Sequence, residues 1–139
     1  MDERLLRQLK EITEEERAIL AGQQGIQRER YTSGRDFVVD SEKMLEKGKL
    51  IEIRPHTRFV HFPRHRHNYV EVLYMCSGSP THILNGTQRM ELHTGDLLFL
   101  NQAVYHEILP AAEGDVGVNF IILPQFFDRS FRMLEQENV

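Results

Sequence analysis

The 139-residue chain has the length of one globular domain, with 40% hydrophobic and 27% charged residues. Its 17 Lys and Arg against 21 Asp and Glu give a net charge of -4, which argues against a nucleic-acid-binding surface because phosphate binding normally requires a basic face. A single cysteine excludes an internal disulfide, no apolar run is long enough to cross a bilayer, and the first residues lack the apolar segment of a secretory signal, so the sequence predicts a cytoplasmic protein that contacts no membrane.

The first clear pattern predicts a helical arm from about residue 2 to residue 21. Its apolar residues at helical spacing are Leu5, Leu9, Ile12 and Ile19. Thr13 is followed three residues later by Glu16, which is the capping-box pattern of a helix N-terminus. The arm is therefore expected to divide into two helices at this point and to end at the glycines from position 22 onward.

A short lead-in connects this arm to the rest of the chain. A strand is expected around residues 26–31, and a short helix over residues 42–46. Asp40 or Ser41 would cap that helix at its start, and Gly48 would end it.

From residue 50 onward the pattern is that of short strands separated by turn residues. The expected strands are 50–54, 59–62, 69–76, 82–84, 88–92, 97–100, 106–109 and 116–123. Asn85 and Gly86 form a type I′ hairpin signal between two of them. Such even spacing predicts a mainly β fold with the double-sheet jelly-roll architecture. After Pro124, residues 125–137 have the pattern of an amphipathic helix with Phe127 and Phe131 on one side.

Four side chains carry the strongest chemical signal, namely His65, His67, Glu71 and His106. Side chains alternate between the two faces of a strand, so the odd positions 65, 67 and 71 can all point inward. Imidazole nitrogens and a carboxylate oxygen suit a divalent metal such as Zn, Ni, Fe, Co or Mn. Without a metal, the same groups offer hydrogen bonds to sugar hydroxyls, and the sequence leaves both alternatives open.

Other polar residues carry weaker signals. Tyr69 shares the inward parity of positions 65, 67 and 71, so it is a candidate to contact a ligand as well as a candidate core residue. Asn119 lies in an apolar strand, where it could face a cavity or satisfy a neighbouring backbone group. The remaining histidines have no ligand spacing and are expected at the surface or at strand edges: His56, His61, His82 and His93.

The motif residues resemble those of the cupin family. His65-Arg-His67, Glu71 and Gly78 have the spacing of the first cupin motif. The stretch from Gly95 to His106 resembles the second motif in part, since Asn101, Ala103 and Pro110 replace its usual residues.

The finer resemblance is to the N-terminal, effector-binding domain of the arabinose-regulator (AraC) family of bacterial transcription factors. It rests on residues 65–78, 95–108 and 118–127 and on the leading helical segment. The resemblance implies a cupin double-stranded β-helix over residues 49–124, preceded by the arm and lead-in (1–48) and followed by a helix (125–139) that begins a linker or dimerisation region. It also implies a homodimer that binds DNA only through a C-terminal helix-turn-helix domain, which this chain lacks.

Two functions are therefore weighed. The first is a sensor domain that binds a small polar effector, a carbohydrate, through His65, His67, Tyr69, Glu71 and His106, with no catalytic residue. The second is a stand-alone metal-dependent cupin enzyme, a dioxygenase or sugar isomerase, in which the three motif histidines and Glu71 hold the metal. An in-frame basic helix-turn-helix region downstream in the gene would favour the sensor.

Overall fold

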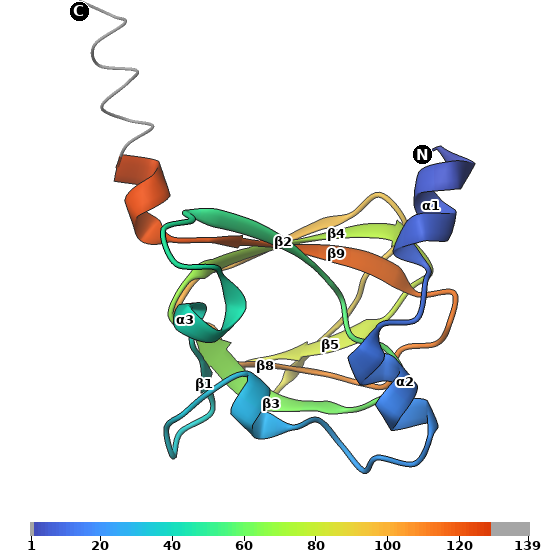
Figure 1. Cartoon of the computed structure of the whole chain (residues 1–139), viewed down its shortest axis with the longest axis horizontal. Coiled ribbons are helices and arrows are strands. Elements are labelled where there is room, and N and C mark those ends of the chain that lie inside the picture. The colour runs from blue at the N-terminus through green and yellow to red at the C-terminus, as the bar shows by residue number, and fades with distance from the viewer. Residues whose placement is uncertain (1, 129–139) are drawn as a thin grey trace, which may run out of the picture.

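Two facing β-sheets make up most of the structure, a computed structural model that describes residues 2–128 (Figure 1). The five-stranded sheet has the order β1 (Val38–Val39), β3 (Phe62–His67), β8 (His106–Ile108), β5 (Thr81–Leu84) and β6 (Gln88–Glu91). The four-stranded sheet has the order β2 (Ile51–Pro55), β9 (Val116–Ile122), β4 (Val70–Ser77) and β7 (Leu97–Leu100). Neighbouring strands are antiparallel except β1 with β3. The predicted mainly β, double-sheet jelly roll is confirmed.

The space between the sheets has an apolar end and a polar end. At the apolar end, one cluster of buried residues comprises Leu73, Met75, Leu84, Leu92, Leu98 and Leu100. At the other end, a cluster that includes Tyr31, Phe62, Tyr69 and Ile121 surrounds the motif histidines. Alternation along the first six residues of β4 sends Glu71 and Leu73 inward and leaves Val72 on the opposite face. The alternation therefore places one carboxylate inside the fold without disturbing the apolar core.

The N-terminal arm consists of two short helices, α1 (Glu3–Leu9) and α2 (Glu14–Leu20), as the sequence predicts. The capping box is present in full: the Glu16 amide donates to Thr13 Oγ1 over 3.1 Å, and the Thr13 amide donates to Glu16 Oε1 over 3.0 Å. It satisfies two backbone donors that a helix start leaves unpaired. The predicted division of the arm is confirmed.

Glu16 also fastens the arm to the barrel through Arg58. The Arg58 side chain donates from Nε to Glu16 Oε2 over 2.8 Å, and the Arg58 backbone amide donates to the same oxygen over 2.8 Å. Arg58 further donates to the carbonyl oxygens of Lys10, Glu11 and Glu113. Both side chains of this pair are buried, with 3% and 1% exposed. The pair thus joins three separate segments of the chain.

Two local expectations are wrong. Residues 26–31 contain a 3-10 turn, Arg28–Arg30, in place of the expected strand. Tyr31, directly after this turn, donates its hydroxyl hydrogen to the Glu15 carboxylate, and this contact with another element stabilises the turn. The strand expected over residues 59–62 begins only at its last residue, because Phe59 has φ 72°, which no strand accommodates.

Other elements agree with the sequence. Helix α3 (Ser41–Met44) is capped by Asp40, although it ends earlier than expected. Asn85 and Gly86 have φ 50° and 77°, as a type I′ turn requires. Residues 124–128 are helical, and the rest of the helix expected to residue 137 lies outside the described residues. Over residues 2–128, no helix has the length and apolar character needed to span a membrane.

Candidate functional site

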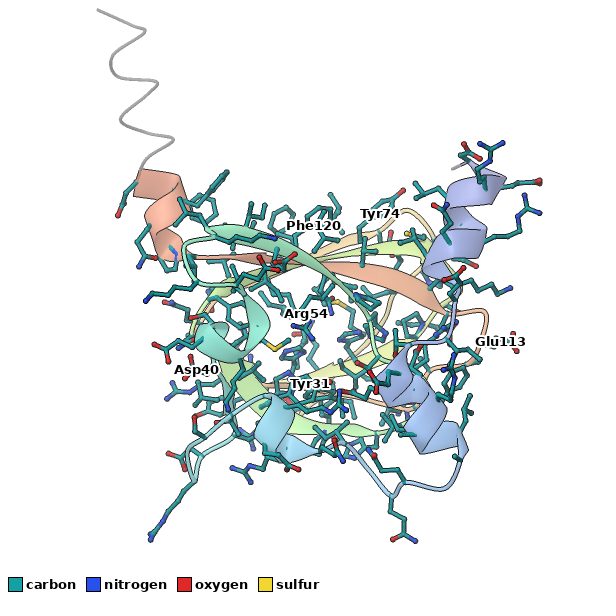
Figure 2. The ribbon with its side chains drawn as sticks, in the orientation of Figure 1. Tyr31, Asp40, Arg54, Tyr74, Glu113 and Phe120 are labelled. Carbon is teal, nitrogen blue, oxygen red and sulfur yellow. The ribbon has the colours of Figure 1, made fainter. Side chains whose placement is uncertain are left out.

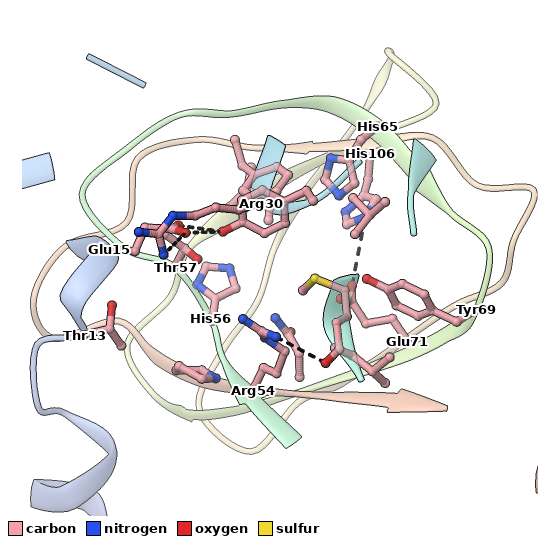
Figure 3. A pocket seen from close by; sticks show the side chains of 18 of the residues that line it. Thr13, Glu15, Arg30, Arg54, His56, Thr57, His65, Tyr69, Glu71 and His106 are labelled. Atoms are coloured by element: carbon pink, nitrogen blue, oxygen red, sulfur yellow. Dashed lines mark hydrogen bonds and ion pairs between the residues drawn. The ribbon is translucent and has the colours of Figure 1, made fainter. Parts of the chain in front are cut away.

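Three of the four motif residues, His65, Glu71 and His106, line one cavity of about 210 Å³ between the sheets (Figure 3), and His67 lies beside them without lining it. His65 and His67 come from β3, His106 comes from the adjacent strand β8, and Glu71 comes from β4 in the opposite sheet. His65 and His106 are register partners across β3 and β8. Nε2 of His67 lies 3.1 Å from Nε2 of His106, and 3.5 Å from Oε2 of Glu71. The grouping expected from the sequence is therefore present.

Backbone carbonyls orient two of the imidazoles. Nδ1 of His65 lies 2.7 Å from the Pro63 carbonyl oxygen, and Nδ1 of His67 lies 3.2 Å from that of Tyr69. A carbonyl accepts only, so each Nδ1 carries the hydrogen and each Nε2 presents a lone pair. Histidine ligands of metal ions are commonly oriented by such carbonyl partners.

The contact between His67 and His106 leaves one atom unsatisfied. With a lone pair on His67 Nε2, the His106 Nε2 must donate, so His106 Nδ1 becomes an acceptor. Among the described residues, this buried Nδ1 has no hydrogen-bond partner. If His67 and His106 held a cation through their Nε2 atoms, His106 would carry its hydrogen on Nδ1.

The charges of the groups suit a cation. Burial lowers the pKa of His65 to about 4 and that of His106 to about 2, so both imidazoles are neutral at pH 7. Burial by itself would raise the pKa of Glu71, but the neighbouring His67, followed by His106 and His65, lowers it to about 2. The site therefore combines the neutral imidazoles of His65 and His106 with one ionised carboxylate.

The spacing of these atoms fits a single divalent ion. One ligand atom each from His65, His67 and His106 lies within 4.8 Å of the others, and Glu71 Oε2 is 4.0 Å from His106 Nε2. Two donors with bonds of about 2 Å to one centre lie at most about 4 Å apart, and the distances from His67 Nε2 to His106 Nε2 (3.1 Å) and to Glu71 Oε2 (3.5 Å) meet this limit. The residues present therefore fit a first-row divalent metal.

Tyr69 forms a wall of the cavity and also belongs to the core. Its side chain is buried, and its ring stacks on His67 with centroids 4.7 Å apart and planes 16° apart. Burial also raises the pKa of its hydroxyl. Tyr69 is therefore both a core residue and part of the cavity wall.

Two further cavity residues, His56 and His82, were missed by the sequence analysis. The expectation that they lie at the surface or at strand edges is wrong, because their exposed fractions are 3% and 1%. His56 follows β2, whereas His82 lies within β5 and has the inward parity of Leu84. That parity is the only signal in the sequence that would have indicated His82. His61 and His93 are exposed, as expected.

Polar residues from β2, β9 and the arm complete the cavity wall. Arg54 and Asn119 are register partners on β2 and β9, and both line the cavity. Arg54 donates to the Met44 carbonyl oxygen over 3.2 Å. On the arm side, the Tyr31 hydroxyl donates to Glu15 Oε1 over 2.6 Å. Asn119 therefore faces the cavity, and the arm contributes directly to the wall.

Comparisons with known proteins agree with this architecture. Residues 49–132 match the family described as "AraC-like ligand binding domain". No curated protein matches the sequence. Similar solved structures include the DMSP lyase DddQ from Ruegeria pomeroyi (15% identity over 53% of this chain and 38% of that chain, TM-score 0.44) and an HTH_3 family transcriptional regulator from Vibrio cholerae (18% identity over 54% of this chain and 44% of that chain, TM-score 0.44). Another is a Cupin 2 conserved barrel domain protein from Salinispora arenicola (18% identity over 57% of this chain and 66% of that chain, TM-score 0.45). The chain thus spans less than half the length of the first two.

Proposed function

The chain belongs to the family of AraC-like ligand-binding domains, and on this basis we propose that it is the sensor domain of a transcriptional regulator. In this proposal a small polar effector, a carbohydrate, binds between the two sheets and controls a helix-turn-helix domain carried elsewhere in a longer protein. The observation that carries the proposal is the cavity itself, which is enclosed by apolar residues yet lined by several hydrogen-bonding side chains.

The chain's own residues supply both recognition and a route for the signal. Neutral imidazoles can donate and accept hydrogen bonds, and the Glu71 carboxylate accepts them from hydroxyls. Glu15 of α2 reaches the same cavity through its bond to Tyr31, so an effector that contacts this wall alters the packing of the arm. Such differential contact is what a ligand needs in order to shift a conformational equilibrium.

Glu71→Gln is expected to weaken effector binding by tenfold or more, because it removes the charged acceptor in the cavity. Calorimetric titration with a panel of monosaccharides, sugar acids, amino acids and small carboxylic acids would measure this. Glu52→Gln is the matched control, since Glu52 pairs with Lys49 at the exposed end of β2. Absence of saturable binding by any member of the panel to the wild-type chain would contradict the sensor function.

We also propose that His65, His67, Glu71 and His106 hold one divalent metal ion (Zn, Ni, Fe, Co or Mn). A bound ion would supply a Lewis-acidic centre with open positions for oxygen atoms of a ligand. The same donor set favours the second candidate function, a metal-dependent cupin enzyme such as a dioxygenase or sugar isomerase. Consumption of a ligand, in place of reversible binding, would identify that function.

The double substitution of His67 and His106 by Ala is expected to abolish stoichiometric metal, because it removes two of the three nitrogen donors. Elemental analysis of protein purified without added metal or chelator measures this. Replacing the exposed His61 and His93 by Ala is the control and should leave the metal content unchanged. If the His67 and His106 double mutant retained the metal, the ion would bind elsewhere in the protein. If none of the proteins contained metal, the metal proposal would be wrong and the cavity would be a polar ligand pocket without an ion.

The partner proposed for this domain is a second copy of the chain. The family resemblance leads us to expect dimer contacts at the terminal helix, and the outer face of the four-stranded sheet is an additional apolar surface. Its central cross-strand row runs Ile53, Phe120, Val72 and Phe99, with Phe99 68% exposed and Ile53 57% exposed. Figure 2 shows Phe120 on this outer side, beyond the ribbon of the sheet. An uncharged face of this kind is self-complementary in a two-fold dimer.

Phe99→Glu is expected to convert a dimer to a monomer, because it would bury a charge in the sheet-to-sheet contact. Sedimentation velocity at micromolar concentrations gives the readout. Leu20→Glu, which changes an exposed leucine of α2, is the matched control. Dissociation by Leu20→Glu and not by Phe99→Glu would move the interface to the arm, whereas a monomeric wild type would contradict dimerisation.

A further inference from the structure

His56 and His82 form a second polar group inside the cavity, separate from the metal-binding set. His82 lies in β5 of the five-stranded sheet, and His56 directly follows β2 of the four-stranded sheet. Their ring centroids are 5.5 Å apart with planes at 43°. The His56 backbone amide donates to the Gly117 carbonyl oxygen over 3.0 Å. This bond fixes the backbone at His56 and does not involve the imidazole ring. Figure 3 shows the His56 ring projecting into the cavity between Thr57 and Arg54. Two imidazoles thus face the same space from opposite walls.

All the ring nitrogens of this pair are buried and unpartnered among the described residues. Leaving one buried polar group unpaired costs about 1–3 kcal/mol, so native proteins rarely retain such groups without a partner. Apolar residues of similar size at these positions would avoid the cost. The pair therefore indicates a ligand, or water that the ligand displaces.

The donors and acceptors of the pair select one kind of ligand. A buried neutral imidazole has one N–H donor and one lone pair. A hydroxyl group also both donates and accepts, whereas a carboxylate only accepts and would leave the lone pairs unmatched. A cavity of about 210 Å³ is also smaller than the roughly 300–1,000 Å³ of sites for drug-sized ligands, which limits the ligand to about the size of a monosaccharide.

We propose that His56 and His82 bind hydroxyl groups of a polyhydroxylated effector, so that they determine the preference of the cavity for a polyol over a carboxylate. This inference rests on the proposed sensor function and names the residues that select its effector. His82 lies beside His106, with parallel rings 6.0 Å between centroids, so a ligand bound by the pair also lies next to the motif residues. The effector thus meets the proposed metal site at one end and the histidine pair at the other.

The test uses His56→Phe and His82→Phe, which keep a planar ring and remove the nitrogens. The whole chain is titrated by calorimetry with D-ribose, L-arabinose, D-glucose and ribitol, and with D-gluconate, pyruvate and citrate as carboxylates. A wild-type preference for the neutral polyols is expected, with a tenfold or greater loss of affinity in each variant. His61→Phe is the matched control, because His61 is exposed and pairs with Glu107 at 2.7 Å. Its affinity should equal that of the wild type.

A second measurement uses the wild-type chain and therefore does not depend on whether the variants fold. In the wild-type chain, ¹⁵N spectra of the imidazoles should show shifts of the His56 and His82 ring nitrogens on addition of the polyol that binds. Polyol binding that is unaffected in both folded variants, or that leaves these nitrogens unshifted, would overturn the inference and leave the sensor function in place.

Two other results also decide the matter. Binding of carboxylates alone would overturn the polyol preference while the cavity remains a sensor site, and binding of no probe would contradict the sensor function itself. A second equivalent of Zn²⁺ that binds wild type and is lost in His56→Phe would identify the pair as metal ligands and overturn the inference.

Discussion

Replacing Gly78 with alanine is expected to destabilise the fold by about 2–4 kcal/mol, as measured by urea denaturation. Gly78 has φ 82°, and a Cβ at this position would lie 2.6 Å from Asp115 Cα and 2.7 Å from the Gly114 carbonyl oxygen. These are backbone atoms, so they cannot give way as a flexible side chain would. The turn after β4 and the segment before β9 would therefore have to move apart. The hydrogen bond from the Ser79 amide to Asp115 Oδ1, 2.9 Å long, joins these two segments and opposes the movement.

Gly86→Ala separates the steric clash from the cost of the backbone conformation. Gly86 has a similar φ of 77°, but the nearest atom to its Cβ is the end of the Arg64 side chain at 3.9 Å. Only the left-handed conformation is then unfavourable, at about 1 kcal/mol. An equal loss of stability in the two variants would show that the close approach at Gly78 relaxes without cost.

Arg58→Met is expected to cost about 3–5 kcal/mol, because it leaves the Glu16 carboxylate buried without its partner. It also removes the donors to the carbonyl oxygens of Lys10, Glu11 and Glu113. Arg30→Met is the matched control, since Arg30 is half-exposed and lies 4.0 Å from Glu15. Exposed ion pairs contribute about 0–1 kcal/mol, so the control should be nearly neutral. A comparable loss in both variants would contradict the importance of the buried pair.

The same pair predicts how stability depends on pH. Burial would raise the pKa of Glu16, but hydrogen bonds from Arg58 and Thr13 outweigh it and lower this pKa below the usual value of 4.5. A lowered folded-state pKa means that the unfolded chain binds the proton more readily, so the stabilisation is present above the unfolded pKa and is lost as pH falls through the folded one. Glu16→Gln should remove this component, which denaturant midpoints between pH 7 and pH 3 would reveal. Identical acid sensitivity in the variant would contradict it.

Local rules predicted much of the fold. The capping box at Thr13 fixed the division of the arm, because its two hydrogen bonds involve residues only three apart. Strand alternation placed His65, His67 and Glu71 on inward faces, and register brought His106 beside His65. The capping box and the alternation depend on spacing along the chain, which the sequence shows directly, whereas the pairing of His65 with His106 depends on the register of two distant strands.

The features that the sequence did not predict depend on contacts between distant segments. Glu16 and Arg58 are 42 positions apart, and neither has a local pattern that would indicate the other. His56 follows the end of β2, where strand parity no longer determines the direction of a side chain, and only its contact with His82 shows that it is inside. The turn over Arg28–Arg30 likewise follows from the bond of Tyr31 to Glu15 on another element.

The buried pair of Glu16 and Arg58 offers a fixed reference point to anyone who would turn this domain into a fluorescent biosensor. Arg58 holds Glu16 in the first turn of α2 and also the Lys10 carbonyl oxygen at the end of α1, so both helices of the arm are fastened to the barrel where they meet. Glu15, the neighbour of Glu16, lines the cavity and is bound to Tyr31. A dye placed close to Glu15 and paired with a second dye on the barrel would therefore convert occupancy of the cavity into a change in light emission.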